Sequence, residues 1–249
     1  MSTISFFNFS LETLKAYNQA QGFKPYMADQ LFQWVYKKSL MNPAEWSNIS
    51  NVAREHFIQH LDFSLPQIVF EAKSRDRTRK FILQMQDGKT VEAVLIPAPN
   101  RLTLCLSSQV GCAIGCTFCH TGTQGLTRHL QVAEVVGQYL VLAQKLAVEN
   151  TGERITNIVY MGMGEPLHNF ENMKRATEIF LEPKGLAFGQ RKITLSTSGM
   201  VPQIEKLGEF PPINIAISLH AAHDDIRSEL MPINKVYDLK RLFTAIKKI

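Results

Sequence analysis

From residue 100 onward, segments with the pattern of a strand alternate with segments with the pattern of a helix. Strands are expected over residues 102–107, 155–160, 192–197 and 213–219, and helices over 132–147, 172–180, 201–207, 224–230 and 239–249. Strands that alternate with helices form βαβ units, in which successive strands are parallel. The pattern therefore predicts an α/β region built on a parallel sheet.

The predicted strands have an unusual composition for a parallel sheet. Strands buried on both faces are nearly continuous apolar runs, but here apolar residues alternate with small or polar ones. The small or polar positions are Thr103, Cys105, Ser107, Thr194, Ser196, Asn214, Ala216, Ser218 and His220. Because side chains alternate between the two faces of a strand, one face should pack on helices while the other lines a cavity for a polar ligand, as a barrel lumen does. A sheet with one face open to solvent is the alternative.

The first hundred residues contain a helical part followed by a hairpin. The helical part has three stretches with helical spacing of apolar residues, and the hairpin has two strand-like runs that flank Asp87-Gly88, a dipeptide typical of tight turns. We expect a small helical domain over 1–65, a basic hairpin segment over 66–99, and the α/β region over 100–249.

Positive charge is concentrated in the hairpin segment. The chain has 27 Lys and Arg against 22 Asp and Glu, a formal net charge of +5. The cations of residues 71–80 are Lys73, Arg75, Arg77, Arg79 and Lys80, against the two acids Glu71 and Asp76. Such a run favours a polyanionic partner, although a solvated protein face has the same pattern.

Three of the four cysteines lie within eight residues, directly after the first predicted strand of the α/β region. Cys112, Cys116 and Cys119 have the spacing C-x3-C-x2-C. We find no export signal at the N-terminus, and a reducing compartment disfavours disulfides. Three thiolates this close can each bind one iron of a [4Fe–4S] cluster. A zinc site completed by Cys105 and His120, or thiols without a ligand, are the alternatives.

The cysteine motif, with an aromatic residue before its last cysteine, is typical of the radical S-adenosylmethionine (SAM) enzymes. Within them, TLCLSSQVGCAIGCTFCHTGTQG (103–125) resembles the RNA adenine-C2 methyltransferases that act on 23S rRNA and tRNA. The resemblance continues in the same order through MGMGEPL, RKITLSTSG, ISLHA and RSELMPIN, which ends at residue 234. It implies a partial (β/α) radical-SAM barrel, incomplete at the C-terminus, with a [4Fe–4S] cluster and SAM as cofactors.

The resemblance also implies roles for individual residues. Cys112, Cys116 and Cys119 become the cluster ligands. The residues implied to bind SAM are Gly164, Glu165, Ser196, Ser218, Leu219 and His220. Glu92 matches the active-site proton acceptor, and Cys105 matches the thiol that resolves a covalent enzyme–RNA intermediate. Taken alone, a strand cysteine is most often a small buried hydrophobe, a strand glutamate is usually exposed, and G-x-G-E is an ordinary turn and N-cap.

Members of the resembled family relay a methyl group through a C-terminal cysteine. One SAM methylates that cysteine, and a second SAM is cleaved to a radical that activates the methyl group for attack on adenine C2. The four cysteines here match other roles, so we expect a C-terminally truncated chain that transfers no methyl group by itself. The alternatives are the sister group that methylates adenine C8 and a non-catalytic basic module that binds zinc and RNA.

The resemblance and the composition together indicate the partners and the location. We expect 23S rRNA and tRNA as substrates, and an electron donor such as a flavodoxin-type reductase system. No run reaches the ~18 apolar residues that a membrane span requires. We therefore expect a cytoplasmic monomer that does not enter a membrane.

Overall fold

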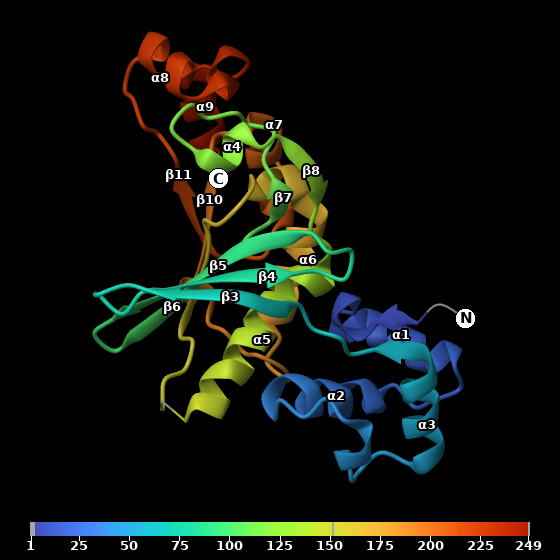
Figure 1. The fold of residues 1–249 in the computed structure, drawn as a ribbon. Helices are drawn as coiled ribbons and strands as arrows, with labels where there is room; N and C mark the ends of the chain where they lie inside the picture. The colour runs from blue at the N-terminus through green and yellow to red at the C-terminus, as the bar shows by residue number, and fades with distance from the viewer. Residues whose placement is uncertain (1–2, 151, 249) are drawn as a thin grey trace.

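The computed structural model describes residues 3–150 and 152–248, and one seven-stranded mixed sheet lies at its centre (Figure 1). The strand order is β11-β10-β9-β6-β5-β4-β3. The parallel strands are β6 (Arg101–Cys105), β9 (Asn157–Tyr160), β10 (Ile193–Thr197) and β11 (Asn214–Ile217), and the antiparallel strands are β3 (Gln67–Lys73), β4 (Arg79–Gln84) and β5 (Thr90–Ala98). The predicted α/β class with parallel strands is confirmed. The sheet is mixed because the hairpin segment pairs directly with β6.

The four strands predicted after residue 100 all form, and each is shorter than predicted. The fourth, expected over 213–219, spans Asn214–Ile217. It ends there because the chain turns away, and His220 adopts a left-handed conformation with φ of 60°. The alternation of apolar and polar residues continues through Ser218 and His220, but the hydrogen-bonded pairing of β11 with β10 ends at Ile217.

Helices cover one face of the sheet. Behind it in Figure 1 lie α5 (Val132–Glu149) and α6 (Phe170–Leu181). The remaining helices of this region are α7 (Val201–Ile204), α8 (Asp224–Leu230) and α9 (Leu239–Ile246). The helix predicted over 239–249 ends at Ile246, and Ile249 lies outside the described residues. No helix in 3–150 or 152–248 is long and apolar enough to cross a membrane.

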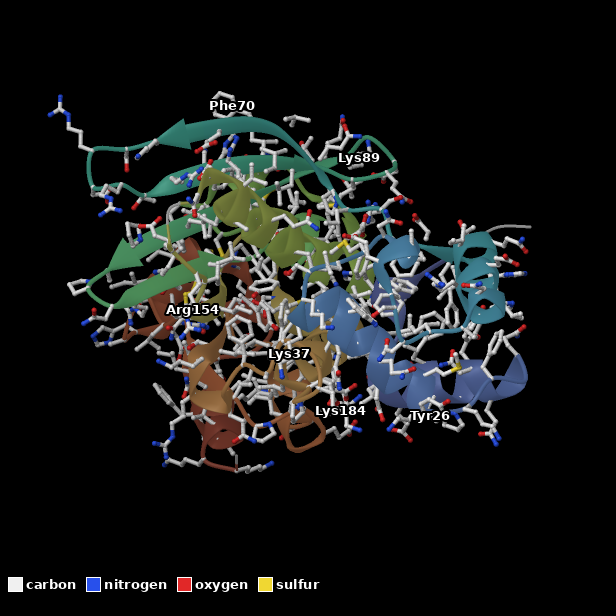
Figure 2. All side chains as sticks on the ribbon, turned by 90° about the horizontal axis from the view of Figure 1, so that it is seen from below. Tyr26, Lys37, Phe70, Lys89, Arg154 and Lys184 are labelled. Atoms are coloured by element: carbon white, nitrogen blue, oxygen red, sulfur yellow. The ribbon has the colours of Figure 1, made fainter. Side chains whose placement is uncertain are left out.

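The N-terminal part is helical, as predicted, and has an aromatic core. Its elements are β1 (Ile4–Ser5), α1 (Leu11–Ala20), α2 (Tyr26–Phe32), α3 (Asn51–His60) and β2 (Leu61–Asp62). Its fully buried rings include Phe6, Phe32 and Trp46. Lys184 Nζ lies 2.8 Å from Asp29 Oδ2 of α2, and Figure 2 shows Lys184 beside the N-terminal helices. The helical part therefore packs directly on the α/β region.

The cysteine segment lies near the carboxyl ends of the parallel strands. It connects β7 (Gln109–Gly111) to α4 (His120–Thr123), and β8 (Leu126–His129) pairs with β7 (Figure 1). Gly111 has φ of 76°, and a Cβ there would lie 1.9 Å from the Gly125 carbonyl oxygen. Only glycine fits that position. The Thr117 N–H donates to the Leu230 carbonyl at 3.0 Å, so the segment is fixed against α8.

Candidate active site

The two faces of the sheet differ as the alternating pattern predicted. In the strand register, Cys105 lies between Val94 and Val159, and Thr194 continues this row on β10. The neighbouring row is Leu95, Leu104, Ile158 and Ile193, all at most 1% exposed. The apolar row packs on the helices, and the other face carries the thiol and hydroxyl groups.

A cavity of ≈ 330 Å³ lies where the parallel strands end. Eight of the predicted site residues line it: Cys112, Cys116, Cys119, Gly164, Glu165, Ser196, Ser218 and His220. Three predicted residues, Glu92, Cys105 and Leu219, are not among its lining residues. Segments that are far apart in the sequence thus contribute to one cavity, and its lining combines thiol, carboxylate and hydroxyl groups.

Two of the three clustered thiols hold their protons more tightly than a free cysteine. Burial, together with repulsion between a thiolate and the neighbouring Cys112 and Cys119, raises the pKa of Cys116 to about 11. Burial also raises the pKa of Cys112. A metal that binds these groups must therefore displace their protons.

The donor set fits an iron–sulfur cluster better than a single metal ion. Within the described residues, no three Cys, His, Asp or Glu side chains converge on a point that could hold one ion. A cubane cluster instead takes each thiolate on a different iron, so three thiols spread around one cavity are suitable ligands. Cys105 does not line that cavity, and the zinc alternative therefore lacks the ligand it required.

Glu165 is a buried carboxylate that holds two main-chain groups. It is 4% exposed. Its Oε1 accepts from the Leu167 N–H at 3.1 Å, and its Oε2 accepts from the Ser198 N–H at 2.7 Å. It is thus the N-cap that the ordinary interpretation of G-x-G-E predicts, and it also lines the cavity. Each oxygen retains acceptor capacity for an ammonium group.

Hydroxyl groups lie opposite the cysteines. Ser196 on β10 and Ser218 just after β11 are hydrogen-bonded, with 3.1 Å between their Oγ atoms. Ser198, which the sequence analysis missed, is 7% exposed and lines the same cavity. Its Oγ is buried and has no hydrogen-bond partner in the described part of the chain. A polar ligand in the cavity can supply that partner, so these residues fit SAM.

Cys105 and Glu92 lie on the polar face but outside the cavity. Burial raises the pKa of Cys105 to about 11, so its thiol is neutral at physiological pH. Glu92 is two residues before Val94, the strand partner of Cys105, and its side chain therefore faces the same side. Its Oε1 lies 3.0 Å from Lys80 Nζ, and the side chain is 43% exposed. The structure places these two residues on adjacent strands, β5 and β6, with their side chains on the same face of the sheet.

Comparison with known proteins decides the family. A match to the radical SAM superfamily covers residues 106–249, and a match to the ribosomal RNA large subunit methyltransferase N-terminal domain covers 4–62. A probable dual-specificity RNA methyltransferase RlmN from Dictyoglomus thermophilum is 43% identical over 96% of this chain and 68% of its own length. The chain belongs to the RlmN family of radical SAM proteins.

Other relatives agree with this assignment to the RlmN family. The dual-specificity RNA methyltransferase RlmN of Bdellovibrio bacteriovorus is 43% identical over 98% of this chain, which spans 60% of that relative. A radical SAM methyltransferase from Sphaerobacter thermophilus superimposes with a TM-score of 0.90 at 38% identity, over 98% of this chain and 72% of that one. The resemblance stated from the motifs is confirmed. Radical SAM proteins of this family use a [4Fe–4S] cluster and SAM.

Two buried polar residues of this RlmN-family chain were present in the motifs but received no role. Gln109 is fully buried, and its Oε1 accepts from the Glu165 N–H at 2.8 Å. A Cβ on Gly164 would lie 2.5 Å from the Gln109 Cβ, which explains the glycine. Arg227 is 0% exposed and donates to carbonyl groups around the cavity. Charged and amide side chains are rarely buried, so their burial here indicates a structural or functional role. The sequence does not show that they are buried, and the fold does.

The charge run of the hairpin is largely paired within the RlmN-family fold. Arg79 lies 2.7 Å from Glu71 and 2.8 Å from Glu149, and Arg77 lies 2.7 Å from Glu153. Within the described residues, Lys73 and Arg75 form no ion pair. Most of the run is therefore structural, and the positive charge available to a polyanion is smaller than the sequence suggested.

Proposed function

We propose that the protein is part of an RNA methyltransferase that methylates C2 of an adenosine in 23S rRNA and in tRNA. The observation that carries the proposal is the cavity that gathers three cysteine thiols, the Glu165 carboxylate and the hydroxyls of Ser196 and Ser218. The chain spans 60% to 70% of the curated relatives it matches. The activity of the whole enzyme is therefore inferred from its family.

The residues of the cavity divide between the two cofactors. Cys112, Cys116 and Cys119 would hold the cluster, while Glu165 would accept hydrogen bonds from the SAM ammonium group. The further residues that would hold SAM are Gly164, Ser196, Ser218, Leu219 and His220. Leu219 does not line the cavity, so its assignment follows from the family resemblance. When bound, the cluster and SAM supply a 5′-deoxyadenosyl radical.

Cys105 and Glu92 would act on the RNA. A thiol that burial keeps neutral needs a base before it can attack or resolve a covalent adduct. Glu92 is exposed enough to exchange protons with solvent, and its Oε1 lies 3.0 Å from Lys80 Nζ. We assign Glu92 as the proton acceptor and Cys105 as the resolving thiol.

An RNA substrate must present an unstacked adenine to the polar face of the sheet. Phosphate contacts position such a substrate without reading its sequence. Among the cations of residues 71–80, Lys73 and Arg75 are those that form no ion pair within the described residues. A low-potential donor such as a flavodoxin-type reductase system would supply the electron. We infer that the protein acts as a monomer in the cytoplasm, where rRNA and tRNA are found.

Mass spectrometry of nucleosides from cells that lack this gene tests the proposal. We expect 2-methyladenosine to disappear from 23S rRNA and from tRNA, with other methylated nucleosides unchanged as internal controls. Loss of 8-methyladenosine instead would assign the protein to the C8-specific group. Unchanged levels of both nucleosides would refute an adenine methyltransferase. Iron and zinc analysis of the anaerobically purified chain tests the cofactor, because stoichiometric zinc without iron would support the binding module.

A further inference from the structure

Arg227 is a buried cation of α8 that contacts two residues of the cavity wall, Ser198 and Ser218. Its Nε donates to the Leu219 carbonyl at 3.1 Å and its Nη1 donates to Asn234 Oδ1 at 2.6 Å. Its Nη2 donates to the carbonyls of Ser198 and Ser218, at 2.7 and 3.3 Å. All four acceptors are neutral. The guanidinium thus ties together the loops that follow β10 and β11.

No acid neutralises this charge directly. Within the described residues Arg227 forms no ion pair. Asp224 does not contact it, and Asn234 lies between them, accepting from Arg227 and donating to Asp224 Oδ1. Asp224 is exposed, and its Oδ1 also accepts from the Leu239 N–H at 2.9 Å. Water screens an exposed carboxylate strongly. A fully buried charge normally has an ionic partner, so the positive field of Arg227 is available to its surroundings.

Arg227 is connected to the cavity by hydrogen bonds. It donates to the Ser198 carbonyl, and the Ser198 N–H donates to Glu165 Oε2 at the cavity wall. The helix that carries Arg227 also contacts the cysteine segment, because the Thr117 N–H donates to the Leu230 carbonyl at 3.0 Å. Three thiolates on a [4Fe–4S] cluster give an anionic site, and one added electron makes it more negative. A fixed cation in a poorly solvated region stabilises the more negative state.

We propose that Arg227 is a positioning residue whose uncompensated buried charge raises the reduction potential of the cluster held by Cys112, Cys116 and Cys119. The inference deepens the proposed function, because it requires that the cluster binds there. The step concerned is the one-electron reduction of the cluster by an external low-potential donor. Arg227 neither gives nor takes a proton or an electron in it.

Three variants separate the charge of Arg227 from its hydrogen bonds. Arg227→Gln removes the charge and keeps an amide donor. Arg227→Lys keeps the charge and loses the planar arrangement of guanidinium N–H donors. The exchange Asp224→Asn with Asn234→Asp leaves net charge unchanged but places a carboxylate against the intact guanidinium. Reconstituted chains are titrated anaerobically with titanium(III) citrate and redox mediators, and the reduced cluster is followed by electron paramagnetic resonance.

We expect Arg227→Gln and the exchange variant to shift the reduction equilibrium at least tenfold toward the oxidised cluster, which is 59 mV for a one-electron couple. Arg227→Lys should stay within threefold of the parent. Equal potentials in the parent and the exchange variant overturn the inference, and so does a loss in Arg227→Lys as large as in Arg227→Gln. If Arg227→Gln does not fold, the exchange variant decides. A parent chain that assembles no cluster refutes the proposed function itself.

Discussion

The two ends of the central sheet place their charges in different ways. At the antiparallel end, Arg79 is paired with Glu71 and Glu149, and Lys145 bridges the same two acids at 3.0 and 2.9 Å. At the parallel end, Glu165 and Arg227 are buried and hydrogen-bond main-chain groups, without an ion pair between them. In the first arrangement, the charges are paired with one another within the protein. In the second, the charges of Glu165 and Arg227 are not paired with each other, so both can act on a ligand.

This difference distinguishes charges that stabilise the fold from charges that serve the site. Partly exposed ion pairs contribute about 0–1 kcal/mol each, and a network adds to this when one side chain serves two partners. A hydrogen bond to a buried charged group contributes about 1.5–3 kcal/mol. Changes at the parallel end should therefore affect cofactor binding first, whereas changes to the Arg79, Glu71, Glu149 and Lys145 network at the antiparallel end should affect stability and leave cofactor binding unchanged.

The largest effect is expected for the cluster cysteines at the parallel end. Cys116→Ala should remove most of the bound iron, because two thiolates cannot hold a cubane that uses three. Iron and sulfide analysis of anaerobically reconstituted protein measures this. Cys105→Ala is the control, since Cys105 is a buried free cysteine that lies outside the cavity. Stoichiometric iron in the triple variant of Cys112, Cys116 and Cys119 would show that the ligands are elsewhere.

A smaller but still large effect is expected at Glu165. In Glu165→Gln, the amide NH₂ must face either the Leu167 or the Ser198 N–H, so one acceptor is lost along with the charge. We expect SAM affinity to fall at least tenfold, about 1.4 kcal/mol, with cluster content unchanged. Equilibrium dialysis with labelled SAM measures the affinity. Glu149→Gln, at the other end of the sheet, should bind SAM like the parent. An equal loss of SAM affinity in that variant would contradict the distinction between the two ends.

Sequence analysis located the chemistry of the parallel end better than that of the antiparallel end. Period-2 alternation placed Cys105 and Ser196 on one face because that period follows from strand geometry alone. It could not show that Arg79 is paired, since Glu149 lies 70 residues away on α5. The burial of Arg227 could not be predicted either, because three of its four acceptors are main-chain carbonyls in the two segments that follow β10 and β11. Local patterns specify faces and turns, whereas long-range pairing of charges depends on the assembled fold.

At the antiparallel end, Arg79→Met should lower stability without changing the site. The variant keeps the aliphatic stem near the Phe81 ring, 5.2 Å from the Arg79 guanidinium carbon, but leaves Glu71 and Glu149 with Lys145 alone. We expect the free energy of unfolding in urea to fall by about 1–2 kcal/mol, with iron content and SAM affinity unchanged. Lys73→Met is the control, as its side chain forms no ion pair among the described residues. A loss of cluster in Arg79→Met would mean that the two ends are coupled.

The smallest expected effect is the pH dependence that Glu149 contributes. Hydrogen bonds from Arg79, then from Lys145, lower the pKa of Glu149 from 4.5 to about 2. A carboxyl whose pKa is lower in the folded state binds its proton more readily when unfolded, so its contribution is complete above pH 4.5 and is lost as pH falls toward 2. Because the pair is partly exposed, we expect about 1 kcal/mol. The unfolding free energy of Glu149→Gln should therefore lie below that of the parent at pH 6, and the two should converge as pH falls through this window. Urea titrations of both chains at several pH values measure the convergence, and a constant difference down to the lowest pH at which both fold would show that Glu149 acts through packing and not through its charge.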